Sequence, residues 1–111
     1  MENKIIKPYG DTEIQAHAAK VGGMRNLREI VVDTDDGMSF HFLVKKPGRS
    51  VIQAIAHAEK KGDIDTQQKL IIACVLEGDK EAYEYDGAVY GQLLENIGQL
   101  LETAKGTIKK L

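Results

Sequence analysis

The stretch from Phe40 to Gly78 constrains the fold of this chain more than any other. At its start every second residue is a large apolar one, which is typical of a half-buried β-strand. Pro47 has no backbone N–H to donate and Gly48 frees the backbone, so the strand is predicted to end there. An amphipathic helix is predicted to follow, because Ser50 and Gln53 have the spacing of a capping box.

The second half of this stretch predicts another helix, which we expect to be the central helix of the core. Gly62 suits the left-handed end of the first helix, and Asp63 and Asp65 can each cap the start of the next. No residue from Leu70 to Leu76 is charged, and a helix that is apolar all round is buried on more than one side. Cys74 lies within this run and is expected to pack as a small buried hydrophobe.

A β-hairpin is also predicted, and its second strand overlaps the start of this stretch. Two apolar-rich runs, Leu27–Asp33 and Met38–Lys46, flank the segment Thr34–Gly37. An Asp-Gly pair between two such runs is the strongest short-range hairpin signal. The sequence is compatible with two kinds of turn: a two-residue loop, or a four-residue turn with Gly37 in the left-handed conformation. The residues expected to share the buried face are Ile30, Val32, Phe40 and Phe42.

The two ends of the chain add further elements. Residues 5–6 can form a short third strand, and Asp11 or Thr12 can cap a short helix that continues to Lys20. Towards the other end, residues 80–86 are predicted to form a polar connection.

The last part of the chain predicts the longest helix, from Ala88 to about Lys109, with Asp86 as its cap. The fold class that follows is α+β: a β-hairpin, which a third short strand can extend, packed against three to four helices with a long C-terminal one. Residues 1–111 are expected to form one domain, with residues 1–24 as a candidate mobile segment. A continuous apolar stripe at helical spacing runs along the last helix. It consists of Tyr90, Leu93, Leu94, Ile97, Leu100, Leu101, Ala104 and Ile108.

Composition narrows the classes of partner and compartment. The formal net charge is −2, whereas a domain that follows a phosphate backbone usually presents a basic face, so nucleic acid is not the favoured partner. No apolar run approaches the ~20 residues of a membrane span, and none near the start resembles a signal peptide. Together with the single cysteine, this favours a reduced, cytoplasmic compartment and argues against a membrane partner.

The sequence contains no constellation that is typical of catalysis, metal binding or cofactor binding. His17, His41 and His57 do not lie at metal-ligand spacing from one another. The aspartates of the hairpin turn lack the ligand ladder and the terminal glutamate of a calcium loop. Gly22-Gly23 lacks the lysine and the spacing of a phosphate-binding loop. We therefore expect a protein that is not an enzyme and that has no metal site and no cofactor.

The remaining candidates for function are side chains that lie outside the predicted core. Lys46 and Arg49 form a basic joint between the strand and the helix, and tyrosines cluster before and within the last helix. Arginine and aromatic side chains are the usual anchors of protein interfaces. The alternative is that these tyrosines cover the core and that the basic side chains solvate a turn. The candidate partner-binding residues are Tyr83, Tyr85, Tyr90, Leu94, Ile97, Leu101, Lys46 and Arg49.

About the last two-thirds of the chain resembles the tail assembly chaperones of tailed bacteriophages and prophages. The resemblance is carried by the joint Lys46-Pro47-Gly48-Arg49-Ser50, by the segment Cys74-Val75-Leu76-Glu77-Gly78-Asp79 and by the long helix expected within 88–111. It implies a non-catalytic protein of the host bacterial cytoplasm that binds the tape-measure protein while the tail tube is assembled. The sequence is also compatible with a homo-oligomer.

Two other functions remain as alternatives. The first is a structural tail or head-tail component of a phage or prophage, which would stay in the finished particle. The second is a small nucleic-acid-binding regulator that contacts phosphates through basic side chains. Those side chains would be Lys45, Lys46, Arg49, Lys60 and Lys61.

Overall fold

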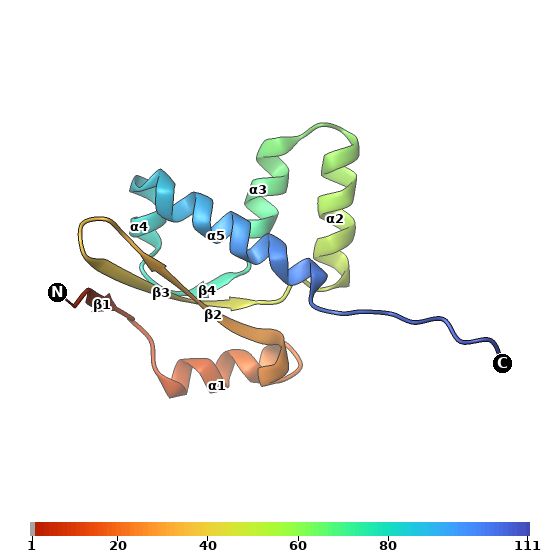
Figure 1. The fold of residues 1–111 in the computed structure, drawn as a ribbon, viewed down its shortest axis with the longest axis horizontal. Helices are drawn as coiled ribbons and strands as arrows, with labels where there is room; N and C mark the ends of the chain where they lie inside the picture. Colours follow the sequence, from red (N-terminus) through yellow and green to blue (C-terminus); the bar gives the residue numbers. More distant parts are fainter. Residues whose placement is uncertain (1) are drawn as a thin grey trace.

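In the computed structural model, which describes residues 2–111, the chain forms a mixed β-sheet with helices on both faces (Figure 1). This architecture confirms the α+β fold class, including the short third strand near the N-terminus. The strands are β1 (Lys4–Ile6), β2 (Leu27–Asp33), β3 (Met38–Lys45) and β4 (Val75–Glu77). The helices are α1 (Asp11–Lys20), α2 (Arg49–Lys60), α3 (Ile64–Ile72), α4 (Lys80–Tyr85) and α5 (Gly87–Gln99), with short 3-10 turns η1 (Met24–Asn26) and η2 (Leu100–Glu102).

The central strand of the sheet is β3. On one side β2 pairs with it antiparallel, so that Ile30 lies opposite Phe42. The other side of β3 is shared, because β1 pairs parallel with its first residues and β4 pairs antiparallel near its end. The predicted hairpin is therefore confirmed. Of its two open turn types the four-residue turn is present, with Gly37 at a φ of 84°.

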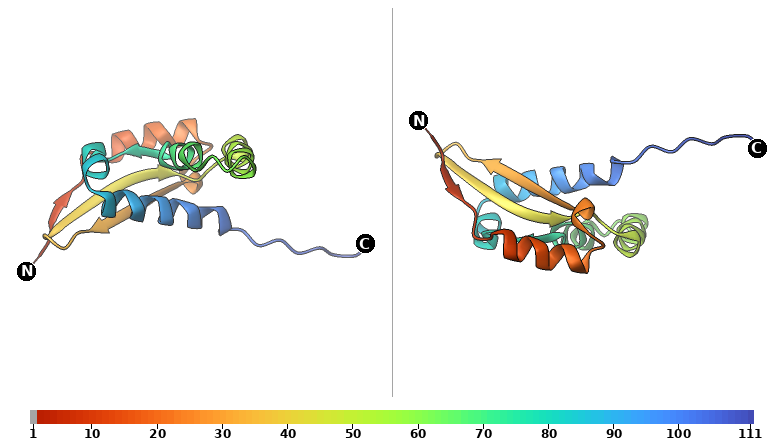
Figure 2. Two further views of the ribbon diagram at one scale, coloured as in Figure 1. Left: turned by 90° about the horizontal axis from the view of Figure 1, so that it is seen from above. Right: turned by 90° about the horizontal axis from the view of Figure 1, so that it is seen from below.

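The main core lies between one face of the sheet and α5 (Figure 2). Ile30, Val32 and Phe42 share this face, as the alternation in the sequence predicts, and half-buried Phe40 packs against the cluster. Cys74 is fully buried, which confirms its predicted role as a small core side chain. The buried residues of this core are Ile30, Val32, Phe42, Val44, Cys74, Val75, Val89, Leu93 and Ile97.

The opposite face of the sheet carries a smaller core under α1. Ala18 of α1 is buried together with Leu27 and Leu43, and Tyr9 completes this cluster. An ion pair adds a polar tie between α1 and β4, where His17 Nε2 lies 3.2 Å from Glu77 Oε2. The sheet is therefore sandwiched between α1 and α5, which Figure 2 shows from two directions.

The caps predicted for α1 and α2 are wrong, whereas α3 and α5 each have a cap that was predicted. α2 begins at Arg49 with the extended backbone of Gly48 as its cap, so Ser50 already lies inside the first turn and caps nothing. In the same way Gly10 precedes α1, and neither Asp11 nor Thr12 caps it. Asp63 rather than Asp65 caps α3, because its Oδ1 accepts a hydrogen bond of 3.1 Å from the amide of Thr66. Asp86 caps α5, as predicted.

The prediction of one helix through Leu70–Leu76 is wrong. α3 ends at Ile72, and Val75 begins the strand β4 beside the end of β3. The amide of Lys45 donates a 2.9 Å hydrogen bond to the carbonyl of Cys74, which brings the turning chain back to the sheet. A short apolar run fits a buried helix and a buried strand equally well, so periodicity alone could not distinguish them.

The last helix is also shorter than predicted, and the connection before it is not irregular. Residues 80–85 form the helix α4, whose cap Asp79 accepts from the amide of Ala82 at 3.3 Å. α5 then ends at Gln99 instead of Lys109, and residues 103–111 are exposed and without regular structure. A helix is stabilised mainly by packing its apolar face, and beyond η2 there is no surface for Ala104 and Ile108 to pack against.

Candidate partner-binding surface

A groove of about 390 Å³ lies between α3 on one side and α4 and α5 on the other. It forms because the chain turns at Asp86, so that Tyr83 from α4 and Tyr90 from α5 come together. Their ring centroids are 6.2 Å apart and the rings are tilted by 41°, while Tyr83 also contacts the core residue Phe42. We call this the tyrosine groove. Its lining residues are Asp65, Lys69, Ile72, Tyr83, Glu84, Gly87 and Tyr90.

The lining of the tyrosine groove combines two aromatic side chains with the charged residues Asp65, Lys69 and Glu84. Burial raises the pKa of the Tyr83 phenol, and the nearby Glu84 and Tyr90 raise it further, so the ring stays uncharged. The Tyr90 hydroxyl donates to Gln68 Oε1 at 3.3 Å. On the rim, Lys69 Nζ lies 2.9 Å from Asp65 Oδ2, and this hydrogen bond raises the pKa of the lysine.

The predicted partner-binding residues divide into core and surface. Ile97 is fully buried against the sheet and belongs to the core. Tyr83, Tyr90 and Leu94 are half-buried, whereas 88% of Tyr85 and 44% of Leu101 are exposed. The apolar stripe of α5 therefore has a sealed side toward the sheet and an open side, which begins at the tyrosine groove and continues to Leu101.

The basic residues do not gather into one patch. Lys46 is half-buried, and its amide donates to the carbonyl of Asn26, while Arg49 is exposed at the first residue of α2. Lys60 lies at the other end of α2, roughly 16 Å from Arg49 at the rise of an α-helix. The five basic candidates thus form two groups, with Lys45, Lys46 and Arg49 before and at the start of α2 and Lys60 and Lys61 at its end.

Sequence reasoning missed the contribution of α3 to the groove. Asp65, Lys69 and Ile72 line it, but they are far from the tyrosines in sequence. Their one local signal is a four-residue spacing, which puts Asp65 and Lys69 on the same helix face. That the face lies against α4 and α5 is a property of the tertiary fold.

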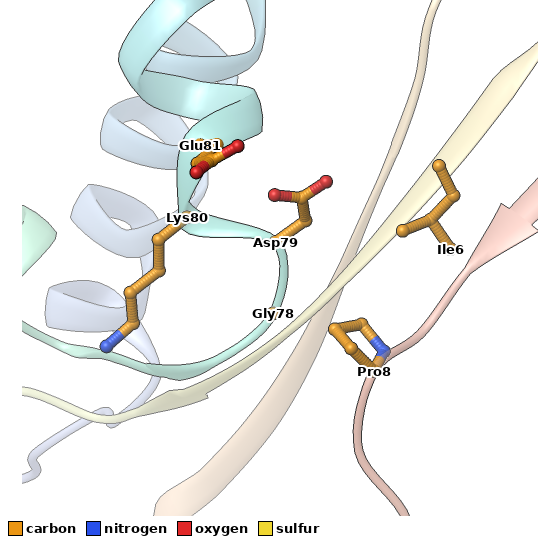
Figure 3. Close-up of a pocket in the computed structure, with 6 residues that line it drawn as sticks. All are labelled: Ile6, Pro8, Gly78, Asp79, Lys80 and Glu81. Atoms are coloured by element: carbon orange, nitrogen blue, oxygen red, sulfur yellow. The ribbon is translucent and has the colours of Figure 1, made fainter.

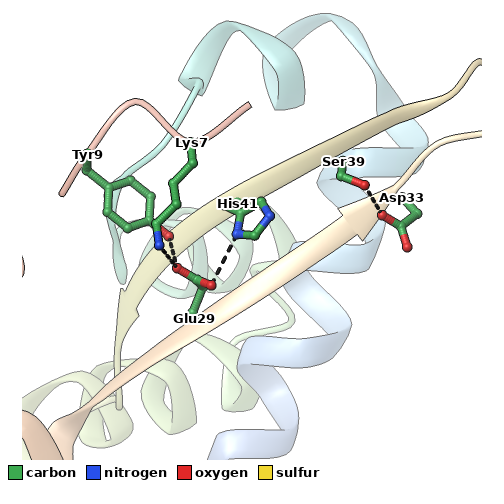
Figure 4. A network of polar contacts seen from close by, with 6 residues as sticks. All are labelled: Lys7, Tyr9, Glu29, Asp33, Ser39 and His41. Atoms are coloured by element: carbon green, nitrogen blue, oxygen red, sulfur yellow. Dashed lines mark hydrogen bonds and ion pairs between the residues drawn. The ribbon is translucent and has the colours of Figure 1, made fainter. Parts of the chain in front are cut away.

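A second polar cluster lies on the face of the sheet that α1 covers in part (Figure 4). Glu29 is its centre: Tyr9 donates to Oε2 at 2.6 Å, Lys7 Nζ lies 3.4 Å away and His41 Nδ1 lies 3.1 Å from Oε1. His41 therefore contacts a carboxylate and is only partly exposed. Further along the same face the Ser39 hydroxyl donates to Asp33.

This cluster fastens the segment between β1 and α1 to the sheet. Partial burial raises the pKa of Glu29, but the hydrogen bonds from Tyr9, His41 and Lys7 outweigh it and hold the pKa below the usual carboxyl range. For Tyr9, burial and the bond to Glu29 raise the phenol pKa, so this buried hydroxyl remains a donor. The donors of this cluster are thus matched by acceptors, and we therefore assign the cluster a role in stabilising the fold.

We expect Glu29→Ala to lower the free energy of unfolding by about 1–3 kcal/mol at neutral pH, because the buried Tyr9 hydroxyl loses its acceptor. Since the folded-state pKa of Glu29 is lowered, the charged form adds stability above the ordinary carboxyl pKa of about 4.3. This contribution to stability is lost as the pH falls through the folded-state pKa of Glu29. Urea unfolding between pH 3 and 7 measures it. Glu29→Gln should show a weaker acid dependence, and exposed Glu2→Gln should match the parent chain.

Another hollow, of about 450 Å³, lies between β1 and the turn before α4 (Figure 3). Ile6 and Pro8 lie on one side and the segment from Gly78 to Glu81 on the other. The carboxylate of Asp79 already caps α4, and no serine, cysteine or histidine is among the residues that line the hollow. We therefore assign it no function.

Residues 2–111 contain no group of three or more His, Cys, Asp or Glu side chains that could hold a metal ion. Within the same residues no helix is both long and apolar enough to cross a bilayer. Comparisons of the chain with protein-family models, with curated protein sequences and with solved structures find no match. The candidate surface is therefore assessed from its own geometry.

Proposed function

We propose that this protein is a non-catalytic tail assembly chaperone, which binds the tape-measure protein of a phage or prophage in the host bacterial cytoplasm. The observation that carries the proposal is the open tyrosine groove, together with half-buried Leu94 of α5 and exposed Leu101 of η2. The resemblance of the joint 46–50, the segment 74–79 and the last helix to this family supports it.

The groove suits an amphipathic helix as its occupant. Helix-in-groove recognition uses anchors spaced three or four residues apart, which enter an apolar channel. Tyr90 and Leu94 are one helical turn apart, and Leu101 lies about two turns beyond, so the open side of α5 extends over roughly 16 Å. A tape-measure protein is a long helical chain whose apolar stripes would otherwise aggregate. Covering such a stripe requires no catalytic residue.

The proposal predicts a neighbouring gene for a tape-measure protein, and the test is co-expression with that protein, followed by affinity capture and titration. Truncating an aromatic anchor typically costs about 2 kcal/mol or more of binding, which is roughly 30-fold in Kd. We expect Tyr90→Ala to weaken binding by about this factor. Met24→Ala is the matched control, because Met24 is an exposed apolar residue in η1, outside the groove.

Two outcomes would count against the proposal. No enrichment over an unrelated helical protein would remove the chaperone function. Equal weakening by Tyr90→Ala and Met24→Ala would remove the tyrosine groove as its site. Mass spectrometry of purified particles separates a chaperone, which is lost from the particle, from a structural tail component, which remains in it.

A further inference from the structure

β2 carries the longest unpaired edge of the sheet. Both edges of β3 are occupied, whereas β2 pairs only with β3. The amide of Thr34 donates to Met38 and that of Lys46 to Asn26, so the even-numbered residues of β2 bond to β3. The N–H and C=O groups of Glu29, Val31 and Asp33 therefore point to the open edge.

This edge is accessible over most of its length. The carbonyl of Leu27 is already occupied, because it accepts a 2.7 Å hydrogen bond from Arg28 Nη1. Within residues 2–111 no other strand pairs with β2 on that side, and 48% of Val31 is exposed. An edge of this kind is a template for an added strand unless something protects it.

An extended segment of suitable length is present in the same chain. Residues 103–111 form an exposed arm that leaves the far end of α5 and points away from the sheet (Figure 1). Extended, the arm spans roughly 30 Å, against about 23 Å for the seven residues of β2. Ile108 is fully exposed within the arm, and a β-branched side chain of this kind is favoured in strands.

Charge complementarity connects the arm to the edge. The arm carries Lys105, Lys109 and Lys110 and contains no Asp or Glu. At the end of β2, beside the start of α5, lies a hollow of about 370 Å³. We call it the acidic hollow. Its lining residues are Val32, Asp33, Thr34, Asp35, Asp86, Ala88, Val89 and Gln92.

We propose that the arm of one copy of this chain adds as a strand to the open edge of β2 in a second copy, with its lysines beside the acidic hollow. A second copy is the occupant, because the arm leaves the molecule at the end opposite to the hairpin turn and runs away from its own β2 (Figures 1 and 2). Each copy then supplies one arm and one edge. Such head-to-tail contacts build open chains or closed rings.

The test is sedimentation of the full chain over a range of concentrations at low salt. We expect reversible self-association, and at least a tenfold weaker association for the double variant Lys109→Glu and Lys110→Glu. The matched control makes the same charge change at Lys60 and Lys61, which are exposed at the end of α2. This control should associate like the parent chain. Adding Asp35→Lys to the arm variant should restore part of the lost association.

A second variant tests the edge itself. Val31→Pro removes a donor that faces the open edge and leaves the ladder to β3 intact, so it should abolish association, whereas Val31→Thr should retain it. A monomer at every concentration would overturn the proposal. Equal effects of the arm variant and its control would also overturn it. A third result would overturn it as well: a monomer in which the β2 amides are protected from hydrogen exchange only when the arm is present. In that case the arm would bind the sheet of its own chain.

Discussion

Gly78→Ala is expected to lower the free energy of unfolding by about 2–6 kcal/mol, from backbone strain and overpacking of about 1–3 kcal/mol each. Gly78 lies in the turn between β4 and α4 with a φ of 138°, a conformation that L side chains rarely adopt. A Cβ built there would clash with Cδ1 of Phe42 and would lie 3.1 Å from the carbonyl oxygen of His41. Neither a core ring nor the central strand can move aside cheaply. Urea or thermal unfolding measures the loss.

The matched control is Gly91→Ala, at an exposed site inside α5 where no atom lies within 4 Å of the added Cβ. It should raise stability by about 0.5–1 kcal/mol, because glycine is a poor helix former. The double variant Gly78→Ala with Phe42→Leu should lose less than the sum of the single losses, since the ring edge that clashes is gone. A stable Gly78→Ala, or strict additivity with Phe42→Leu, would contradict the packing described for this turn.

Leu93→Ala is expected to cost about 2–5 kcal/mol, because this side chain is fully buried between α5 and the sheet. That loss is a large share of the ~5–15 kcal/mol that stabilises a typical domain. The chain should therefore unfold at much lower denaturant concentration, which circular dichroism follows directly. The size of the loss in unfolding free energy depends on how far the surrounding core residues relax into the space that is left.

Leu101→Ala provides the comparison on the open side of the same stripe. With 44% of its surface exposed, Leu101 should contribute under about 1 kcal/mol to stability. Its loss should instead appear in binding to the tape-measure protein, if the proposed function holds. Equal destabilisation by the two substitutions would mean that the stripe is one continuous core face, and the surface offered to a partner would be much smaller.

The predicted site was only partly recoverable from the sequence. The pattern placed Tyr90, Leu94 and Ile97 on one stripe, but it could not show that Ile97 is fully buried, that Leu94 is half-buried and that Tyr90 lines a groove. Residues spaced at three and four positions share a broad face, and its division depends on what packs against each part. The second wall of the groove comes from α3, which no local pattern connects to α5.

Local chemistry determined much of the fold. The Asp-Gly hairpin, the caps at Asp63 and Asp86 and the left-handed end at Gly62 involve only neighbouring residues, so the sequence by itself specified them. Three features needed the tertiary structure: the strand at Val75–Glu77, the end of α5 at Gln99 and the open edge of β2. Each depends on whether a partner distant in sequence is there to bond or pack against, and a pattern of neighbours does not contain that information.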